Sequence, residues 1–437
     1  MYDIQEIENS VRNQLKQTDQ SFHSWYQFVL GFPPHLVRYY INKFEVNNES
    51  RVLDPFCGTG TTNVECKKLN IESLGLEANP MAYFASRVKT NWQPASSELR
   101  RALEFVMASA VVSFEKFGFP EDISLFSGNR KGAILPIEPK LTEEELKVLP
   151  KDFISPQPLR RILVLRECVR AVEDEETRDL LLLAVASLTV GHASNVAFGP
   201  EIYTTKPKKD VRVLDHFFGL VDRMVCDLEA QSAATKHATI VHGDARKMSD
   251  FFPRECGRVQ FVITSPPYPN EKDYTRTTRL ESIILGLITS KDQLRALKEN
   301  LMRSNSRNVF VDDSDHECVK PFDSVTRLAD SIEEKRIRMG KTSGFEKLYH
   351  RIVRNYFGGM YRHLESLKPL LSAHARLAYV VGDQMSFFQT HIATAHILAE
   401  IAERLGYKVN EIELWRTRLS TATKRQIDEN VLILSTD

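Results

Sequence analysis

Two short segments contain the residue types that could carry out chemistry, and each directly follows an apolar, β-type run. The first is the turn Asp54-Pro55-Phe56-Cys57-Gly58-Thr59-Gly60-Thr61-Thr62, which precedes a helical stretch from Asn63 to Leu69. Its glycines allow the backbone to approach a ligand closely, and the start of the helix offers unpaired N–H groups to an anion. A dinucleotide-binding loop needs a third glycine where Asn63 stands, and a P-loop needs a Gly-Lys-Ser/Thr that this turn lacks. The turn therefore indicates a ligand site at a strand end, disfavours a dinucleotide and excludes a P-loop.

An acidic residue follows this turn at the spacing that ribose recognition uses. Glu77 ends the next β-type run, about 20 residues further on, and a carboxylate there can accept hydrogen bonds from both ribose hydroxyls. Ribose recognition without a pyrophosphate loop suggests a nucleoside cofactor that lacks phosphates, which points to S-adenosylmethionine. Asp54 could pair with the amino group of that cofactor, and the turn amides or Thr61 and Thr62 could bind its carboxylate. The alternative is a strand-ending Asp-Pro turn, with Glu77 as a solvated charge.

The second segment is Thr264-Ser265-Pro266-Pro267-Tyr268, at the end of the β-type run 258–264. Two successive prolines fix φ and remove two backbone donors, so they give a rigid, extended turn and leave the Pro266 carbonyl free to accept a bond. Ser265 adds a small polar group, and Tyr268 offers a flat face for stacking. Two acceptors that grip the hydrogens of an exocyclic amine favour a pyramidal nitrogen, which stabilises the transition state of its methylation. A base reaches such a pocket only by leaving the stack, and an aromatic face then holds it. The alternative is a surface turn with a core tyrosine.

The composition limits the class of protein that carries these turns. The chain has 437 residues, of which 42% are apolar and 27% charged, with 58 Lys plus Arg against 58 Asp plus Glu. These values are typical of a globular protein and exclude a collagen, a coiled coil and wholesale disorder. Because the net charge is zero, a nucleic-acid surface must come from local patches. The cysteines show no C-x-x-C spacing, the histidines lack the spacing of metal ligands, and no signal peptide or membrane-spanning run is evident, so we expect a cytoplasmic protein without a metal site.

The elements that must position the two turns form an alternating pattern of strands and helices. The expected strands are 51–54, 72–77, 239–244, 258–264, 376–383, 408–414 and 430–434. Apolar runs bounded by Gly, Asp and Pro are typical of strands buried on both faces of a parallel sheet, so the pattern predicts an α/β fold with right-handed crossovers. A helix before Gly406 places Ile397, Leu398, Ile401 and Leu405 on one face. Two long, mainly helical segments, 95–236 and 270–370, interrupt the alternation, and we interpret them as insertions that carry specificity.

The two turns together resemble those of the amino-group DNA methyltransferases, in which DPFCGTG is followed downstream by a TSPPY-type turn. The serine form is similar to the N4-cytosine branch, whereas N6-adenine members more often have Asp or Asn at the position of Ser265. Weaker matches are 32–37, which resembles the family's cofactor-wall segment, and 243–246, in which the Asp244 carboxylate would meet the adenine edge of the cofactor. The resemblance implies a Rossmann-like, seven-stranded, S-adenosylmethionine-dependent methyltransferase sheet with helical insertions. Together with the reasoning above, it assigns catalysis to Ser265, Pro266, Pro267 and Tyr268, and cofactor binding to Phe32, Pro34, Asp54, Phe56, Gly58, Gly60, Thr61, Thr62, Glu77, Asp244 and Thr264.

The resemblance also divides the chain into five parts. Residues 1–94 are expected to form the N-terminal part of the methyltransferase domain with the cofactor-binding turn, 237–290 its catalytic part, and 371–437 its C-terminal strands and helix. Residues 95–236 are a helical insertion and a candidate for target recognition, and residues 291–370 are a basic helical insertion and a candidate for DNA contact.

Within the second insertion, a basic cluster between residues 335 and 354 has seven Lys or Arg against one acid. Side chains of this kind supply affinity for the DNA backbone but no sequence information. We expect DNA contacts from Arg336, Arg338, Lys341, Arg351 and Arg354.

The function that the resemblance implies is transfer of a methyl group from S-adenosylmethionine to the exocyclic N4 amine of a flipped cytosine. The substrate would be double-stranded DNA, and the setting a bacterial restriction–modification or defence system with a possible cognate restriction endonuclease, acting at the nucleoid. One alternative is the same chemistry on adenine N6. Another is an RNA guanine-N2 methyltransferase, a family that shares DPFCGTG but usually begins its catalytic turn with Asp. A third alternative is a DNA-binding module without turnover, and a nicotinamide oxidoreductase is disfavoured by Asn63. Cys57 is expected to pack rather than to react.

Overall fold

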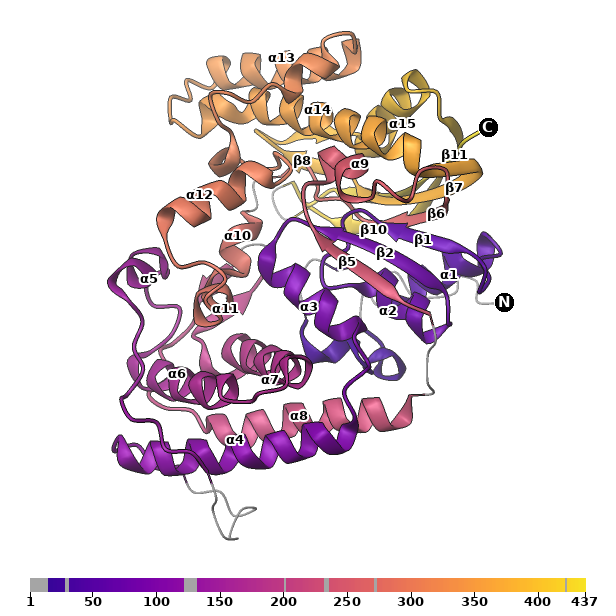
Figure 1. Ribbon diagram of the computed structural model, residues 1–437. Helices are drawn as coiled ribbons and strands as arrows, with labels where there is room; N and C mark the ends of the chain where they lie inside the picture. The colour runs from indigo at the N-terminus through magenta and orange to yellow at the C-terminus, as the bar shows by residue number, and fades with distance from the viewer. Residues whose placement is uncertain are drawn as a thin grey trace.

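A seven-stranded sheet is the centre of the computed structural model, which describes residues 15–27, 31–121, 132–199, 202–231, 236–270, 273–420 and 423–437. The strand order is β10-β11-β7-β6-β1-β2-β5 (Figure 1). The strands β5, β2, β1, β6 and β7 pair in parallel, and β11 is antiparallel to both of its neighbours. Their bounds are β1 Arg51–Asp54, β2 Glu72–Glu77, β5 Ala238–His242, β6 Val259–Thr264, β7 Leu371–Gly382, β10 Lys408–Leu419 and β11 Gln426–Ser435. This Rossmann-like methyltransferase sheet confirms the expected fold class.

Successive residues of the central strands pack into two different cores, one on each face of the sheet. Val52 of β1 lies in a core with α1 (Pro34–Lys43). Leu53, the next residue, lies in the core of the other face with α14 (Tyr349–Leu367) and α15 (Thr394–Arg404). Because helices cover both faces, each strand is apolar at consecutive positions, and this is why the sequence shows apolar runs instead of strict alternation.

The expected helix before Gly406 is α15. It ends at Arg404, and Gly406 follows with a φ of +78°. Glycine adopts this left-handed conformation without a steric penalty, so it ends the helix in the usual way.

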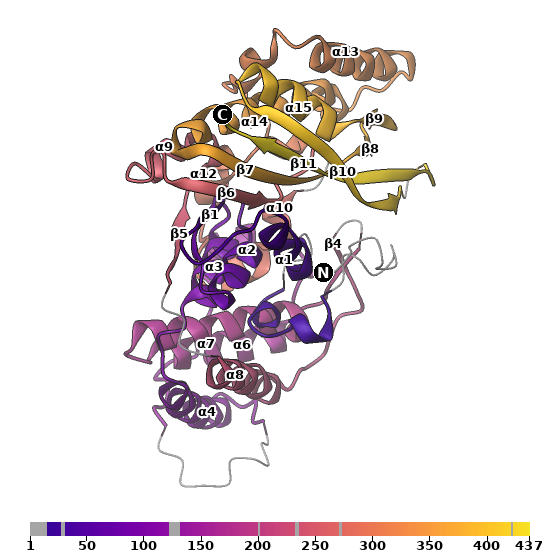
Figure 2. The same ribbon diagram turned by 90° about the vertical axis from the view of Figure 1, so that its right-hand side faces the viewer.

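The segment between β2 and β5 forms a separate helical layer below the sheet (Figures 1 and 2). Its elements are α4 Ser96–Lys116, α5 Glu143–Val148, α6 Pro156–Arg170, α7 Glu175–Leu188, β3 Val196–Phe198, β4 Ile202–Thr204 and α8 Val213–Ala230. The long helices share an apolar core in which Phe114, Leu165, Leu181 and Phe217 are fully buried. This core extends to α3 (Pro80–Thr90), which lies between the layer and the sheet.

The segment between β6 and β7 is also helical, but it is divided between two places. The helices α10 (Tyr274–Thr277), α11 (Arg279–Ile284) and α12 (Lys291–Asn300) lie on one side of the molecule, where the sheet meets the helical layer (Figure 1). The helix α13 (Asp323–Arg338) packs on the outside of α14. The sequence analysis assigns α14 to the basic insertion, yet its apolar face is buried against the sheet, so this helix is part of the sheet's own covering layer. None of the helices in the described ranges is long and apolar enough to cross a membrane.

Candidate active site

A cavity of about 670 Å³ lies at the carboxyl ends of the parallel strands. It is lined by residues that directly follow four strands, namely Phe56 after β1, Ala78 after β2, Ser265 after β6 and Gln384 after β7. Gly58 and Tyr268, which belong to the two turns singled out in the sequence, both line it. The carboxyl edge is the usual place for a ligand in an open α/β sheet, and the volume is that of a small-molecule site. The structure therefore brings the two turns to one cavity.

The turn after β1 requires both of its glycines. Gly58 and Gly60 have φ values of +53° and +84°, a left-handed conformation that side chains disfavour. A Cβ on Gly60 would also lie 3.0 Å from the Cβ of Ser86 in α3. After Gly60 the chain enters α2 (Thr61–Lys68), and Thr61, its first residue, lines the cavity.

Asp54 and Thr264 lie behind the cavity wall, where they join the ends of β1 and β6. The Thr264 hydroxyl donates to one Asp54 oxygen at 2.6 Å, and the Phe56 amide donates to the same oxygen at 3.1 Å. The other carboxyl oxygen is buried without a hydrogen-bond partner among the described residues. Burial raises the pKa of Asp54 to about 6, although these donors act in the opposite direction. The predicted cofactor residues that do not belong to the described cavity lining are Pro34, Asp54, Gly60, Thr62 and Thr264.

Glu77 lines the cavity at the end of β2 and is fixed by the backbone. One carboxyl oxygen accepts the Gly58 amide at 2.8 Å, and the other accepts the Asn79 amide at 2.7 Å. Each oxygen keeps a second lone pair that a ribose hydroxyl could use. Burial raises the pKa of Glu77 to about 7, in spite of the two amides. A single carboxylate thus links the glycine turn to the end of the neighbouring strand.

Asp244 also lines the cavity, but Arg246 already holds its carboxylate. The Arg246 Nε donates to both oxygens at 3.0 Å, and Nη2 donates to Oδ2 at 2.7 Å. The same guanidinium bonds Asp315 at 2.7 Å, which ties this part of the wall to the segment before α13. An adenine amine at Asp244 would share these oxygens with the guanidinium.

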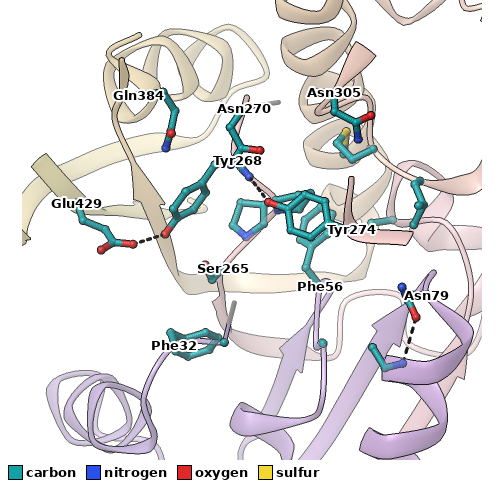
Figure 3. Close-up of a pocket in the computed structure, with 18 of the residues that line it drawn as sticks. Phe32, Phe56, Asn79, Ser265, Tyr268, Asn270, Tyr274, Asn305, Gln384 and Glu429 are labelled. Atoms are coloured by element: carbon teal, nitrogen blue, oxygen red, sulfur yellow. Dashed lines mark hydrogen bonds between the residues drawn. The ribbon is translucent and has the colours of Figure 1, made fainter. Parts of the chain in front are cut away.

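The turn after β6 supplies a flat wall and a free acceptor. Ser265, Pro266 and Pro267 line the cavity, and no described residue donates to the Pro266 carbonyl. Figure 3 shows the side chains of Ser265, Tyr268 and Tyr274 close together at this turn. An unused carbonyl acceptor and two aromatic side chains therefore belong to the same short segment of the cavity wall.

Two contacts, one of the hydroxyl and one of the ring, hold the side chain of Tyr268 in place. Its hydroxyl donates to Glu429 of β11 at 2.7 Å, and burial with this carboxylate raises the pKa of Tyr268 well above its usual range (Figure 3). Its ring packs on Gly382 at the end of β7, where a Cβ would lie 2.8 Å from the tyrosine Cε2. The ring can occupy this position only because residue 382 has no side chain.

Several cavity residues were not predicted from the sequence. Asn270 and Tyr274 follow Tyr268 within a few positions, and this closeness to the motif is a signal that could have found them. Asn305 and Asn308 come from the loop between α12 and α13, where no sequence pattern marks them. They reach the cavity only through the packing of the insertion.

A hairpin after β7 forms another unpredicted part of the wall. It consists of β8 (Gln384–Ser386) and β9 (Thr390–Ile392), and its tip has φ values of +48°, +63° and +56° at Phe387, Phe388 and Gln389. Three successive non-glycine residues in the left-handed region are strained, and such strain persists only where packing enforces it. Here the Tyr349 ring lies 4.9 Å from that of Phe387 and 5.1 Å from that of Phe388.

The residues predicted to contact DNA lie on α13, on α14 and in the turn between them. Three of them are paired with acids: Arg336 with Glu333 at 2.6 Å, Lys341 with Glu346 at 3.6 Å, and Arg354 with Asp330 at 2.5 Å. Arg351 donates to the Phe310 carbonyl at 3.4 Å, and Arg338 is exposed at the end of α13. Much of the positive charge of this cluster is therefore balanced within the chain.

The lining of the cavity fits S-adenosylmethionine. Glu77 offers two acceptor positions for ribose, Phe32 and Phe56 offer flat apolar surfaces for a base, and the Gly58 turn with Thr61 offers a helix start for a carboxylate. The buried, unpartnered oxygen of Asp54 lies behind the same turn. No group of three or more His, Cys, Asp or Glu within the described ranges could hold a metal ion.

Comparisons with known proteins agree with this geometry. A family model for N6/N4 methyltransferases, described as DNA methylase, matches residues 1–86. The chain is 21% identical to the Type II methyltransferase M.AvaI of Nostoc sp., over 89% of this chain and 80% of that protein. It is 25% identical to the Type II methyltransferase M.BsoBI of Geobacillus stearothermophilus, over 93% and 82% of the two chains. It is also 31% identical to M.MjaII of Methanocaldococcus jannaschii, over 17% of this chain and 14% of that one. The pair of turns, the strand order and these matches make the chain similar to the amino-group DNA methyltransferases, whose methyl donor is S-adenosylmethionine.

Proposed function

We propose that this protein is a site-specific DNA methyltransferase of a restriction–modification system, and that it methylates the exocyclic N4 amine of a flipped cytosine. The observation that carries the proposal is the shared cavity, which has the Gly58 turn and Glu77 on its cofactor side and the Ser265–Tyr268 turn on its substrate side. The Type II methyltransferases among the relatives support DNA as the substrate and the restriction–modification setting. The choice of N4 depends on the serine at position 265.

Methylation requires an available lone pair on the amine nitrogen, but in a free base this lone pair is delocalised into the ring. S-adenosylmethionine, when bound, supplies an electrophilic methyl group on a positively charged sulfur. In our proposal the Ser265 hydroxyl and the Pro266 carbonyl each accept a hydrogen bond from one N–H of the amine. These two bonds reduce the delocalisation of the nitrogen lone pair into the ring, so the lone pair becomes available. Because these bonds are strongest when the nitrogen is pyramidal, they favour the transition state over the bound base. The nitrogen would gain the methyl group as the methyl–sulfur bond of the donor breaks, which leaves a neutral thioether, and the methylated nitrogen would release one proton to solvent.

The two tyrosines would hold the extruded base. Tyr268 is fixed by Glu429, and the Tyr274 hydroxyl accepts a bond from the Tyr268 amide at 3.4 Å. Stacking on an aromatic ring contributes roughly 1–3 kcal/mol per base. We therefore expect Tyr268→Ala to weaken substrate binding and turnover by that amount.

Parts of the chain outside the cavity would bind the duplex. We propose that the helical layer of residues 95–236 reads the target sequence and that residues 291–370 contact the backbone, with Arg336, Arg338, Lys341, Arg351 and Arg354 near phosphate. A cognate restriction endonuclease would cut the same sequence when it is unmethylated.

The direct test is to treat DNA with the protein and S-adenosylmethionine, digest it to nucleosides and identify the methylated base. We expect N4-methylcytosine as the product, and slower formation of the same product by Tyr268→Ala. N6-methyladenine as the sole product would replace the cytosine assignment with its adenine alternative. Methylation of guanine N2 in structured RNA but not of DNA, or DNA binding without any methyl transfer, would overturn the proposal.

A further inference from the structure

Three arginines that belong to neither turn lie close in sequence to residues of the cavity wall. Arg276 belongs to α10, Arg279 begins α11, and Arg307 lies in a short 3-10 turn (Ser306–Asn308). Each is close in sequence to a residue that lines the cavity, because Tyr274 precedes Arg276 by two positions, and Asn305 and Asn308 flank Arg307. Figure 1 places α10, α11 and α12 together where the sheet meets the helical layer. We call Arg276, Arg279 and Arg307 the rim arginines.

The rim arginines have little acidic compensation. Arg279 is half-buried and donates to the carbonyl and hydroxyl of Thr275, at 3.1 and 2.7 Å, rather than to a carboxylate. Asp273 is the nearby acid, but it is already bonded to Lys298 at 3.2 Å and to the Thr275 hydroxyl at 2.7 Å. Asp273 is therefore already shared with Lys298, and Arg279 has no ion pair of its own among the described residues.

The other two rim arginines form no ion pair with any described residue. The Arg276 guanidinium lies over the Phe153 ring, 5.8 Å from its centroid. Arg307 is exposed to solvent. Their charges also act on Arg279, because burial and the repulsion of Arg307 and Arg276 lower its pKa, while Asp273 acts in the opposite direction. Like charges held this close are unfavourable unless an anion joins them.

We propose that the rim arginines bind the DNA phosphates on either side of the nucleotide that enters the cavity. This inference rests on the proposed function, and it says which residues contact the DNA phosphates beside the target nucleotide. A nucleotide extruded into the cavity stays joined to the duplex through both of its phosphates, so these groups must cross the edge of the cavity. In this proposal Arg276 would act next to Tyr274, and Arg307 next to Asn305 and Asn308, which line the cavity. A guanidinium suits this task because its planar donors match two phosphate oxygens at once.

The basic cluster on α13 and α14 is less suited to bind the phosphates next to the target base. Arg336, Lys341 and Arg354 already have acidic partners within the chain. An ion pair must be broken or shared before such a side chain gains a phosphate, whereas the rim arginines lose no carboxylate. We therefore assign the phosphates next to the target base to the rim, and leave the α13–α14 cluster to more distant backbone.

The test compares Arg276→Gln/Arg279→Gln/Arg307→Gln with a control of equal charge change. The control is Arg254→Gln/Arg404→Gln/Lys408→Gln, whose residues are exposed near the amino ends of β6 and β10: Arg254 precedes β6, Arg404 is the last residue of α15, and Lys408 begins β10. DNA affinity is measured by fluorescence anisotropy on a duplex that contains the methylated site, at several KCl concentrations, and S-adenosylmethionine affinity by calorimetry. We expect the rim variant to bind DNA more weakly and to reduce the slope of log K against log[salt] by about 2 to 3, near 0.9 for each lost phosphate contact. The control should keep the wild-type slope, and both should keep the wild-type cofactor affinity.

A single substitution at an exposed position separates an effect on DNA binding from a folding defect in the triple variant. Arg307→Gln changes an exposed side chain, and we expect it to reduce the salt slope by about 1 and to raise KM for DNA more than it lowers kcat. Unchanged DNA affinity and slope in both rim variants, with cofactor binding intact, would overturn the rim assignment while wild-type methylation of DNA still supported the proposed function. Absence of DNA methylation by the wild-type protein would instead overturn the proposed function itself.

Discussion

The Tyr268 hydroxyl donates a 2.7 Å hydrogen bond to Glu429, which lies 161 positions later in the chain. Glu429 also accepts Nε of Arg416 at 2.5 Å, so the last two strands of the sheet share in holding this ring. The turn that holds Tyr268 follows β6, near the middle of the sheet, and β10 and β11 at one edge fix its tyrosine ring. The position of this ring in the cavity wall is therefore determined by contacts within the chain.

We predict that Glu429→Gln lowers kcat/KM for DNA by about tenfold, because a hydrogen bond to a charged group contributes about 1.5–3 kcal/mol. Glutamine is similar in size but is a weaker acceptor for Tyr268. Tyr268→Phe should have a loss of similar size, and the double variant should lose little more than either single one, since both changes break one contact. Steady-state kinetics would measure kcat/KM for DNA of the two single variants and the double variant. The affinity for S-adenosylmethionine, measured by calorimetry, is the control. Losses that simply add would show that Glu429 does not act through the tyrosine hydroxyl.

We predict that Gly382→Ala lowers methyl transfer by at least about tenfold. The new Cβ would lie 2.8 Å from Cε2 of Tyr268, so the ring must move from the cavity wall. Gly219→Ala in α8 is the matched control, because no atom lies within 4 Å of its Cβ position. Full activity of Gly382→Ala at unchanged stability would mean that the ring position does not matter for the reaction.

We predict that affinity for S-adenosylmethionine rises with pH through about 7, the pKa to which burial raises Glu77. The ionised carboxylate is the better acceptor for ribose hydroxyls, and it is the form that accepts the amides of Gly58 and Asn79. Calorimetry between pH 5.5 and 8.5 would measure the dependence. Glu77→Gln should bind more weakly and should lose the inflection near 7. An inflection that persists in this variant would assign the titration to another group.

We predict that ionisation of Asp54 destabilises the folded protein. Its folded pKa of about 6 lies above the ordinary value of 3.8, so its stabilising contribution is complete below about pH 4 and is lost as the pH rises through 6. Asp54→Asn does not titrate and keeps an oxygen for Thr264 and Phe56. Wild type should therefore lose up to about 3 kcal/mol relative to Asp54→Asn between pH 4 and pH 6. Urea unfolding of both proteins at several pH values measures this difference, and a constant difference would contradict the assignment.

We predict that Cys57→Ala retains methyl transfer. Cys57 lines the cavity, but burial raises the pKa of its thiol well above the usual range, so the thiolate that a nucleophile requires is not formed. A methylation assay with a folded variant is sufficient. Complete loss of activity at an intact fold would require a role for the thiol in the reaction.

The parts of the site that could be predicted are those fixed by local sequence. A strand must end where Asp54-Pro55 and Pro266-Pro267 stand, and the glycines at 58 and 60 are needed for a left-handed turn, so both turns are visible in the chain itself. Glu77 was found in the same way, through its spacing from the glycine turn. The sheet followed because consecutive apolar residues such as Val52 and Leu53 require a cover on both faces.

What could not be predicted depends on contacts between distant segments. Nothing local marks Asn305 as a cavity residue or Glu429 as the partner of Tyr268, because packing of the insertion and pairing of β11 bring them there. The charge that a surface presents also depends on how its elements pack. The basic run 335–354 is conspicuous in the sequence, but two acids just outside it balance part of its charge. Glu333 pairs with Arg336 within α13, and Asp330 pairs with Arg354 only after α13 and α14 pack together.

Val52 and Leu53 of β1 lie beside Phe261 and Val262 of β6, and the hydroxyl of Thr264 reaches Asp54 where the two strands end. The separation between the two turns is thus determined by the pairing of β1 with β6, and the length of chain between the strands has no influence on it. The segments 95–236 and 270–370 can therefore differ in length without moving the two turns apart.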